Sequence, residues 1–401
     1  MIPSAILKPG KDIPLAAGHP WVFSNAIETV DGTPGPGDLI EVRSSKGASL
    51  GLGTWNGMNS IRIRMLTRNA SERIDADFFE TRFRALAAWK ESRLPTGTNG
   101  YRLVHAETDG IPGLIVDRYA DVFVFQLHTV GMDRLRDEIL EGLGRLDPRA
   151  IVERSDVEAR VRDGLKTLPP RVHAGTIDGP VPFTEHGLSF LADVVGGQKT
   201  GFFLDQRDAR AEVGRLAKGK RVLNLFGYTG AFSLHAAKGG ADFIATVDVS
   251  VPALEMAERQ FQANGLDPAE ASKYLFLEAD VLELLEAETI EGAPYDLIVC
   301  DPPAFAKTDS QVDKALRAYG ELNEACLRRL APGGILVTSS CSGRVSAEDF
   351  RSMLRLAAGK AGRDVRLLGF LGQPIDHAER LAFPEGRYLK TAILEVTHLL
   401  S

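Results

Sequence analysis

The sequence predicts an α/β protein with three parts: an N-terminal β-barrel, a central α+β domain and a C-terminal Rossmann-like domain. Three observations lead to this fold class. Residues 1–75 alternate short apolar runs with glycine and proline, residues 76–190 mix helical and strand-like patterns, and residues 191–401 repeat a strand followed by a helix. A chain of 401 residues with 44% apolar side chains can build two or three such domains.

The N-terminal part is expected to be a small barrel, because turn-forming residues separate four short apolar runs. The expected strands are Trp21–Phe23, Leu39–Val42, Ala48–Gly53 and Ile61–Met65, with a turn at Gly32–Asp38. Arg62 and Arg64 alternate with isoleucines, so both arginines belong to one face of the last strand. That face is either simply solvated or a surface that contacts phosphates.

The central part is expected to open with a helix, since aromatic and aliphatic side chains recur at helical spacing from Ala76 to about Ser92. The elements expected after it are a hairpin of Gly110–Asp117 and Val122–Leu127, a helix Met132–Leu146 and a strand Ala150–Glu153. Such a mixture of local and paired elements is typical of an α+β domain.

The C-terminal part alternates apolar strands with helices, as parallel sheets do. The expected strands are Val222–Leu225, Phe243–Val247, Leu275–Leu277, Leu297–Cys300 and Ile335–Ser339. Two of the expected helices are Val251–Asn264 and Lys314–Leu330. A sheet of this kind binds its ligand beyond the carboxyl ends of the strands, where the strand order reverses.

A glycine turn, Gly227-Tyr228-Thr229-Gly230, lies where the first of these strands passes into a helix. Glycine lets the backbone approach a ligand, and the helix N-terminus offers N–H donors. Asp248 ends the next strand and is placed to accept from ribose hydroxyls, although it could instead cap the helix that begins near Val251. Asp280 follows the third strand and could accept from an adenine amino group. This pattern favours an adenosyl ligand, and the absence of G-x-G-x-x-G argues against a dinucleotide.

Asp301 follows an apolar strand and precedes Pro302 and Pro303. A carboxylate held by two prolines suits hydrogen bonding to a flipped base, and a capped loop is the alternative. Phe305 is expected either to stack on that base or to belong to the core.

The three cysteines are expected to differ in role. Cys341 follows a strand among small polar residues, so it is the candidate nucleophile, although an isolated cysteine is often only a small apolar core residue. Cys326 shares a helical face with leucines and is expected in the core. Cys300 is either a buried strand terminus or an accessory thiol. Without a CxxC or a Cys/His cluster, neither a metal site nor a disulfide framework is expected.

Two polar segments have open roles. Asp205, Gln206 and Arg207 precede the first parallel strand and either line the cofactor or start a helix. His377 and the segment Pro384–Lys390 belong to a late loop that is either structural or close to the site.

Composition indicates the cellular compartment of the protein more clearly than it indicates the substrate. The net charge of −7 does not by itself predict nucleic-acid binding, because a local basic strip can bind phosphates on an acidic protein. The chain lacks a run of 18 apolar residues and an apolar leader, so we expect a cytoplasmic protein with no membrane partner.

Taken together, the motifs resemble the PUA-domain-containing, RlmI-like family of S-adenosylmethionine-dependent ribosomal RNA cytosine-5 methyltransferases. The resemblance spans nearly the whole chain, and the motifs that carry it are G-H-P-W-V-F at Gly18–Phe23, the segment Gly197–Arg207, N-L-F-G-Y-T-G-A-F-S at Asn224–Ser233, D-P-P-A-F at Asp301–Phe305, S-S-C-S-G at Ser339–Gly343, and D-H with P-E-G-R-Y-L-K at Asp376–Lys390. It implies a PUA barrel at 1–75, a central domain at 76–190 and a class I methyltransferase domain at 191–401. It also implies large-subunit (23S) ribosomal RNA as partner and suggests a homodimer.

The resemblance assigns the site residues as follows. It suggests that Cys341 is the nucleophile and Asp301 the base-contacting acid. The expected cofactor-binding residues are Asn224, Phe226, the glycine turn, Asp248, Asp280, Gln206 and Arg207. Asn224 replaces an aspartate common in methyltransferases, Ala378 replaces a proline, and Ala304 stands where many related enzymes carry a second thiol. The implied product is 5-methylcytosine; methylation of an exocyclic amine and a non-catalytic assembly factor are the alternatives.

Overall fold

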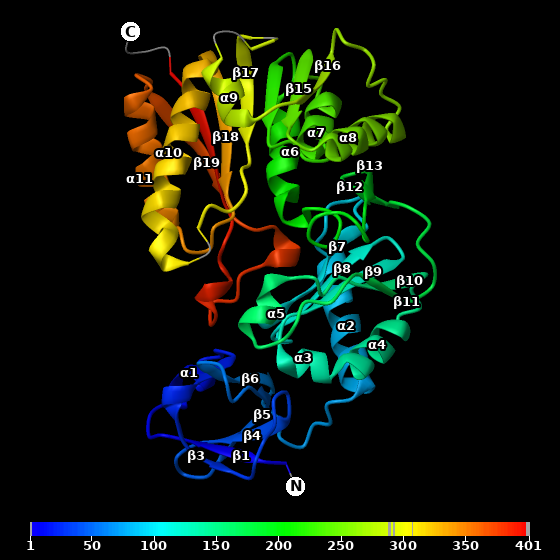
Figure 1. Cartoon of the computed structure of the whole chain (residues 1–401), viewed down its shortest axis with the longest axis vertical. Helices are drawn as coiled ribbons and strands as arrows, with labels where there is room; N and C mark the ends of the chain where they lie inside the picture. Colours follow the sequence, from blue (N-terminus) through cyan, green and yellow to red (C-terminus); the bar gives the residue numbers. More distant parts are fainter. Residues whose placement is uncertain (1, 288–289, 292, 307, 398–401) are drawn as a thin grey trace. The chain divides into compact units, whose positions relative to one another are not determined.

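The computed structural model describes residues 2–287, 290–291, 293–306 and 308–397. The contacts divide the chain into two compact units (Figure 1). Unit 1 comprises Met1–Gly187, Leu191–Leu204 and Ile375–Gly386, and unit 2 comprises Leu188–Phe190, Asp205–Pro374 and Arg387–Ser401. The three-domain boundaries at 75 and 190 stay a prediction.

Unit 1 starts with a six-stranded sheet in the order β2-β6-β5-β4-β1-β3. Its strands are β1 (Ser4–Leu7), β2 (Trp21–Phe23), β3 (Ile27–Asp31), β4 (Leu39–Arg43), β5 (Ser49–Trp55) and β6 (Ile61–Thr67), with a short helix α1 (Ile13–Ala16) after β1. Alternate side chains such as Ala5, Ile40, Val42 and Ile63 are fully buried and form the barrel core. The four predicted strands are confirmed. Two more, β1 and β3, were not predicted, and they pair with each other antiparallel.

A second sheet of unit 1, in the order β11-β10-β9-β8-β7, follows α2 (Ala76–Glu91), which Asp75 caps. Its strands are β7 (Gly100–His105), β8 (Leu114–Tyr119), β9 (Val122–Leu127), β10 (Ala150–Glu153) and β11 (Arg171–Ala174), and a hairpin of β12 (Val181–Glu185) with β13 (Leu188–Ala192) follows. The predicted strand from Gly110 begins only at Leu114, because Gly110 and Gly113 have φ of 80° and 84° in a left-handed turn.

The predicted helix Met132–Leu146 is wrong in detail, because it is two helices. These are α3 (Val130–Arg134) and α4 (Arg136–Gly144), and a short helix α5 (Glu158–Arg162) comes later. Leu135, with φ −93° and ψ 19°, interrupts the helical backbone while its side chain stays buried in the core. Thr129 caps α3 by accepting from Met132 N at 3.3 Å.

Unit 2 is built on a seven-stranded sheet in the order β16-β15-β14-β17-β18-β20-β19. Its strands are β14 (Arg221–Leu225), β15 (Phe243–Asp248), β16 (Tyr274–Glu278), β17 (Tyr295–Cys300), β18 (Leu330–Ser340), β19 (Val365–Leu371) and β20 (Lys390–Val396). The strands β16 to β18 in this order pair in parallel, whereas β20 pairs antiparallel with both β18 and β19. The strand order reverses between β14 and β17, which is where such sheets bind ligands.

Two helical layers accompany this sheet (Figure 1). One contains α6 (Arg207–Leu216), α7 (Ala231–Lys238) and α8 (Val251–Ala263), and the other contains α9 (Val281–Glu286), α10 (Val312–Arg329) and α11 (Ala347–Lys360). All five predicted strands and both predicted helices of this region are present, with ends shifted by a few residues. The prediction of an α/β protein with a Rossmann-like C-terminal part is confirmed.

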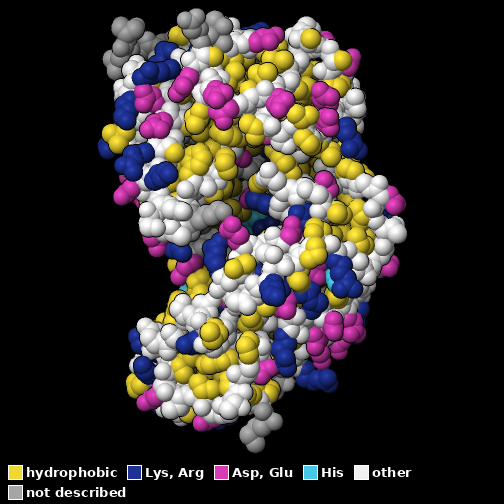
Figure 2. Space-filling view, in the orientation of Figure 1, with side chains coloured by type: hydrophobic (Ala, Val, Ile, Leu, Met, Phe, Trp, Pro, Cys, Tyr) yellow, Lys and Arg dark blue, Asp and Glu magenta, His cyan; other side chains and the backbone are white. Residues whose placement is uncertain are grey.

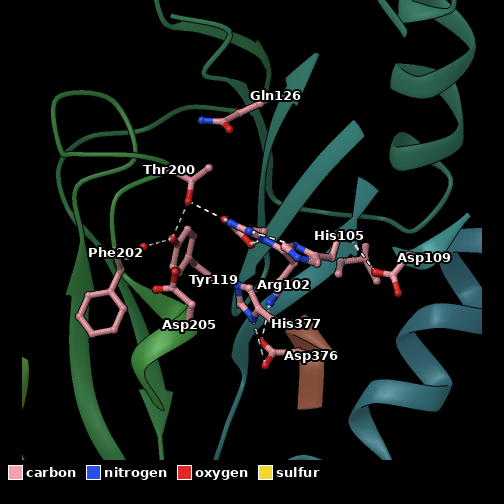
Figure 3. Close-up of polar contacts among 12 residues, drawn as sticks. Arg102, His105, Asp109, Tyr119, Gln126, Thr200, Phe202, Asp205, Asp376 and His377 are labelled. Carbon is pink, nitrogen blue, oxygen red and sulfur yellow. Dashed lines mark hydrogen bonds and ion pairs between the residues drawn. The ribbon is translucent and has the colours of Figure 1, made fainter. Parts of the chain in front are cut away.

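A buried polar network holds the segments Leu191–Leu204 and Ile375–Gly386 within unit 1 (Figure 3). Arg102 Nε and Nη2 donate to the two oxygens of Asp117 at 2.8 Å each, and Thr200 Oγ1 donates to Asp117 Oδ2 at 2.6 Å. Asp376 Oδ2 accepts from Arg102 N at 2.9 Å, and Lys90 Nζ donates to the carbonyl of Asp376 at 3.0 Å. The segments Leu191–Leu204 and Ile375–Gly386 are therefore held by charge-assisted hydrogen bonds to the central sheet.

Candidate active site

The glycine turn after β14 is a compact loop with unusual backbone angles. Phe226 and Tyr228 have φ of 55° and 46°, and Gly230, just before α7, has φ of 72°. A Cβ on Gly227 would lie 2.6 Å from Thr246 Cγ2, so only glycine fits there. Left-handed non-glycine residues cost free energy and gather at ligand sites. The turn that was predicted from sequence is thus present, and its conformation is one that functional sites retain.

Asp248 holds this turn from the end of β15. Its Oδ2 accepts from Tyr228 N at 2.8 Å and its Oδ1 accepts from Ser250 N at 2.9 Å. Ser250, and not Asp248, caps α8. The alternative that Asp248 is a helix cap is therefore wrong, and each carboxylate oxygen keeps a second lone pair that can accept from a ribose hydroxyl.

Two other polar residues near the turn have different surroundings. Asn224 is 1% exposed and donates from Nδ2 to Ser233 Oγ at 2.9 Å, which favours a packing role beneath the turn over direct cofactor contact. Asp280 is exposed, and its Oδ1 accepts from Leu282 N and Glu283 N at 2.8 and 3.1 Å as the N-cap of α9. Its Oδ2 makes no hydrogen bond with the residues that the structure describes, so the adenine role of Asp280 stays a prediction.

These residues fit S-adenosylmethionine. Among the described residues, Thr229 Oγ1 in the glycine turn is buried and has no hydrogen-bond partner. Buried polar atoms are normally hydrogen-bonded, so this hydroxyl is available to a bound ligand. The turn brings backbone N–H groups to the start of α7, and Asp248 supplies acceptors for a ribose. In Asp280, Oδ1 caps α9 and Oδ2 is available to accept a hydrogen bond from a ligand. The same donors and acceptors suit an adenosyl group in particular.

The acid after β17 is paired with a residue from a distant segment. Gln206, at the end of the short helix η3 (Leu204–Gln206), donates from Nε2 to Asp301 Oδ1 at 2.7 Å. Asp205, the residue before Gln206, accepts from Tyr388 Oη with its Oδ2 at 2.9 Å. Arg207 is the first residue of α6, which agrees with the alternative that this segment starts a helix. Its side chain is fully buried. Sequence reasoning assigned Gln206 to the cofactor and did not find its contact with Asp301.

The D-P-P-A-F loop is tied to the loop after β18. Ala306 N donates to Ser342 Oγ at 3.3 Å, and the ring of Phe305 lies 4.6 Å from the ring of Tyr319. Phe305 packs against the main core cluster, which favours the core interpretation over base stacking. Pro302 is buried and Pro303 is exposed, so only Pro303 is open to a substrate in this conformation.

The three thiols differ as the sequence suggests. Cys326 and Cys300 are both 0% exposed, and burial beside Cys326 raises the pKa of Cys300 well above its usual value. This confirms Cys326 as a core residue and argues against an accessory role for Cys300. Cys341 is only partly buried and follows β18 directly, so it is the least buried of the three cysteines.

Lys390 is a neighbour of Cys341 that sequence reasoning left as part of a loop. It is the first residue of β20, it pairs with Ser340 in the β18–β20 ladder, and it is 3% exposed. Its Nζ donates to the carbonyls of Ser342 and Val345 at 2.6 and 2.8 Å. Burial lowers the pKa of Lys390 to about 8, and the charge of Cys341 opposes this shift. The signal in the sequence is only the end of the P-E-G-R-Y-L-K motif.

The two arginines of β6 make internal contacts in unit 1. Arg64 is ion-paired with Asp163 at 3.0 Å and lies 3.8 Å from Glu107, with 11% of its side chain exposed. Arg62 donates from Nη1 to the carbonyl of Gly57. The ion pair with the buried Asp163 contradicts a simply solvated face at Arg64, and phosphate contact by Arg62 and Arg64 stays a prediction.

The visible surface mixes both signs of charge (Figure 2). Lys and Arg side chains are interspersed with Asp and Glu over the face shown. Among the described residues, every helix is too short or too polar to cross a bilayer. Any nucleic-acid contact on this face must depend on local groups and not on a broad basic field.

Comparison with known proteins identifies the family. Residues 178–358 match the S-adenosylmethionine-dependent methyltransferase family model, and residues 5–68 match a PUA-like domain. The chain is 44% identical to ribosomal RNA large subunit methyltransferase I of Shewanella denitrificans, over 97% of this chain and 98% of the relative. It is 42% identical to the protein of that name from Aeromonas salmonicida, over 96% and 97% of the two chains.

Solved structures agree on the fold. A candidate SAM-dependent methyltransferase from Streptococcus mutans has a TM-score of 0.80 at 24% identity and covers 99% of this chain and 100% of its own. A candidate methyltransferase complexed with SAH has a TM-score of 0.82, with the same identity and coverage. The chain therefore belongs to the ribosomal RNA large subunit methyltransferase I family of S-adenosylmethionine-dependent methyltransferases.

Proposed function

We propose that this protein methylates C5 of a cytosine in large-subunit (23S) ribosomal RNA and that Cys341 forms a transient covalent bond to the base. The relatives' names support the RNA substrate. The observation that carries the chemistry is the placement of Asp301 and Cys341 directly after β17 and β18, which are paired neighbours in the sheet. Their two loops are joined by the hydrogen bond from Ala306 to Ser342.

The cofactor would be held by the glycine turn Gly227–Gly230, with Asp248 on the ribose and Asp280 toward the adenine. Bound S-adenosylmethionine would supply an electrophilic methyl group to a carbon that the protein has activated. The left-handed backbone of Phe226 and Tyr228 keeps the turn in its binding shape before the ligand arrives, so less ordering is needed on binding.

A thiol is needed because C5 of cytosine is not nucleophilic in the aromatic ring. The Cys341 thiolate would add to C6, which breaks the C5–C6 double bond and places electron density on C5. Asp301, in its protonated form, would donate its proton to N3 of the base as the thiolate adds, which stabilises this adduct, and would take that proton back when the thiolate leaves. After C5 is methylated and its proton is removed by a base, the C6–S bond breaks and the thiolate leaves, which restores the double bond.

The RNA would be held first by its phosphates. In unit 1, Arg68 is exposed and makes no hydrogen bond or ion pair with the residues that the structure describes. The partial burial of its guanidinium and the charge of the neighbouring Arg380 both lower the pKa of Arg68. Two guanidinium groups that repel each other attract an anion. Phe23 is 40% exposed on the same unit and offers a ring to an unstacked base. We propose action in the cytoplasm, and a homodimer as the assembly.

The experiment that tests this function identifies the product. Unmodified large-subunit ribosomal RNA is incubated with the enzyme and S-adenosylmethionine, digested to nucleosides and analysed by mass spectrometry. We expect 5-methylcytidine with the wild type and none with Cys341→Ala, while calorimetry shows that Cys341→Ala still binds S-adenosylmethionine. An N4-methylated product made equally by both proteins would contradict the proposal and indicate the exocyclic-amine reaction. No cofactor binding by either would indicate an assembly factor.

A further inference from the structure

The position of Lys390 beside the thiol is set by the backbone. In the antiparallel β18–β20 ladder Lys390 lies opposite Ser340, and Ser339 lies opposite Thr391. The hydroxyls of Ser339 and Thr391 are 2.8 Å apart, which closes this end of the ladder with a buried hydrogen bond. Because Cys341 is the next residue after Ser340, this register places Lys390 at the start of the loop Cys341–Val345, which we call the cysteine loop.

The ammonium group of Lys390 organises that loop. Its two hydrogen bonds end on the carbonyls of Ser342 and Val345, one residue and four residues after Cys341. Among the described residues, Lys390 pairs with no carboxylate. A buried cation without a counter-ion costs free energy, and such groups are retained mainly where they have a function.

Other ionisable groups lie on this loop and beside it. Arg344 belongs to the loop, and its exposed side chain is ion-paired with Asp309 at 3.4 Å. Tyr319 on α10 is fully buried, and its Oη lies 3.0 Å from Ser342 Oγ. Burial raises the pKa of Tyr319, and the neighbouring charge of Cys341 raises it further, so the tyrosine stays neutral beside the thiol. Lys390 is therefore the buried positive charge at this loop, whereas Arg344 is exposed, and burial makes the field of Lys390 stronger than that of a surface lysine.

We propose that Lys390 is a positioning residue that fixes the Cys341–Val345 loop and stabilises the thiolate form of Cys341. The thiol loses its proton to solvent, which is possible because Cys341 is only partly buried, and the resulting charge is balanced by the ammonium of Lys390. The proposal takes Cys341 as the nucleophile from the proposed function. It goes further by naming the group that makes this thiol reactive at neutral pH.

The test measures the thiol without RNA or cofactor. The full-length protein is alkylated with iodoacetamide between pH 5 and 10, and the rate at Cys341 is followed by peptide mass spectrometry. We expect a wild-type midpoint below the ordinary thiol value of about 8.5. Lys390→Met should raise the midpoint by about one pH unit, so that alkylation at pH 6 slows about tenfold. Lys390→Arg keeps the charge and should stay near the wild type, as should Tyr319→Phe.

An unchanged midpoint in folded Lys390→Met would overturn the proposal. If that variant does not fold, the coupling is measured from the other side. Cys341→Ser is nearly isosteric, and NMR of the lysine side-chain nitrogens should show that the pKa of Lys390 falls when the thiolate is removed. No change there would overturn the proposal equally. The outcome is separate from the proposed function, because a lysine-dependent thiol combined with full methylation by Cys341→Ala would refute only the latter.

Discussion

Gln206 Nε2 donates a hydrogen bond to Asp301 Oδ1 at 2.7 Å, although the two residues are 95 positions apart. The contact connects the end of η3, just before α6, with the loop that follows β17. A carboxylate that accepts this bond is held at one orientation, and a hydrogen bond to a charged group contributes about 1.5–3 kcal/mol. Gln206 therefore acts on the predicted base-contacting acid, whatever else it contacts.

Removing this amide should slow the reaction more than it weakens cofactor binding. For Gln206→Ala we expect kcat to fall at least about tenfold while the calorimetric Kd for S-adenosylmethionine changes less than about threefold, because the loss is mainly in positioning Asp301. Gln262→Ala, on the exposed face of α8, is the control and should leave both values unchanged. A Gln206→Ala enzyme with normal kcat and weak cofactor binding would assign Gln206 to the cofactor alone.

Asp248 should matter for the cofactor because it both shapes the turn and offers acceptors to a ribose. Asp248→Asn loses the charge and one of the two N–H contacts, so we expect at least about tenfold weaker binding of S-adenosylmethionine by calorimetry. Asp242→Asn changes an exposed carboxylate just before the opposite end of β15 and serves as the matched control. Equal affinity of the two variants would show that Asp248 does not contact the ligand.

The close approach of Gly227 to Thr246 predicts a clash that a second change relieves. Gly227→Ala should destabilise the protein by about 1–3 kcal/mol in urea unfolding, because its Cβ would lie 2.6 Å from Thr246 Cγ2. Thr246→Ser removes that methyl group and keeps the hydroxyl that lies 2.7 Å from Ser233 Oγ. The double variant should therefore recover part of the loss. If it is no more stable than Gly227→Ala, the contact with Thr246 is not the cause.

Arg68 should contribute to RNA affinity through charge alone. Arg68→Ala is expected to weaken binding of ribosomal RNA and to reduce the salt dependence of log K by about one counterion, measured by filter binding over a range of salt concentrations. Arg43→Ala is the control, because Arg43 is exposed on the same unit but is paired with Glu41 at 2.7 Å. A loss shared equally by both variants would point to a general charge effect.

The five parallel strands of the C-terminal part were predictable because buried parallel strands are continuous apolar runs, whereas the antiparallel strands β19 and β20 were not predicted. The first sheet was harder. Ser4–Leu7 and Ile27–Asp31 are short and gain their stability from pairing with each other and from β4, which a local pattern does not contain. Leu135 likewise fits a helical pattern, so the break between α3 and α4 at this residue is not visible in the sequence.

The candidate site residues could be located from sequence where they lie at the ends of predicted strands, and their contacts could not be predicted where these depend on tertiary pairing. The glycine turn, Asp248, Asp301 and Cys341 stand at strand ends that the sequence shows. The contacts of Gln206 with Asp301 and of Lys390 with the cysteine loop depend on tertiary structure and on strand register. The ion pair of Arg64 with Asp163 was not predicted for the same reason, since alternation gives the face of a strand but not the carboxylates that pack against it.

The most direct test of the central claim traps the covalent bond between Cys341 and the base. Ribosomal RNA containing 5-fluorocytidine is incubated with the enzyme and S-adenosylmethionine, and the denatured mixture is analysed by gel electrophoresis and peptide mass spectrometry. Fluorine at C5 cannot leave as a proton does, so we predict a stable RNA–protein adduct at Cys341 that depends on the cofactor and is absent in Cys341→Ala. Methylation of natural RNA by this enzyme without any adduct on the fluorinated RNA would contradict the account.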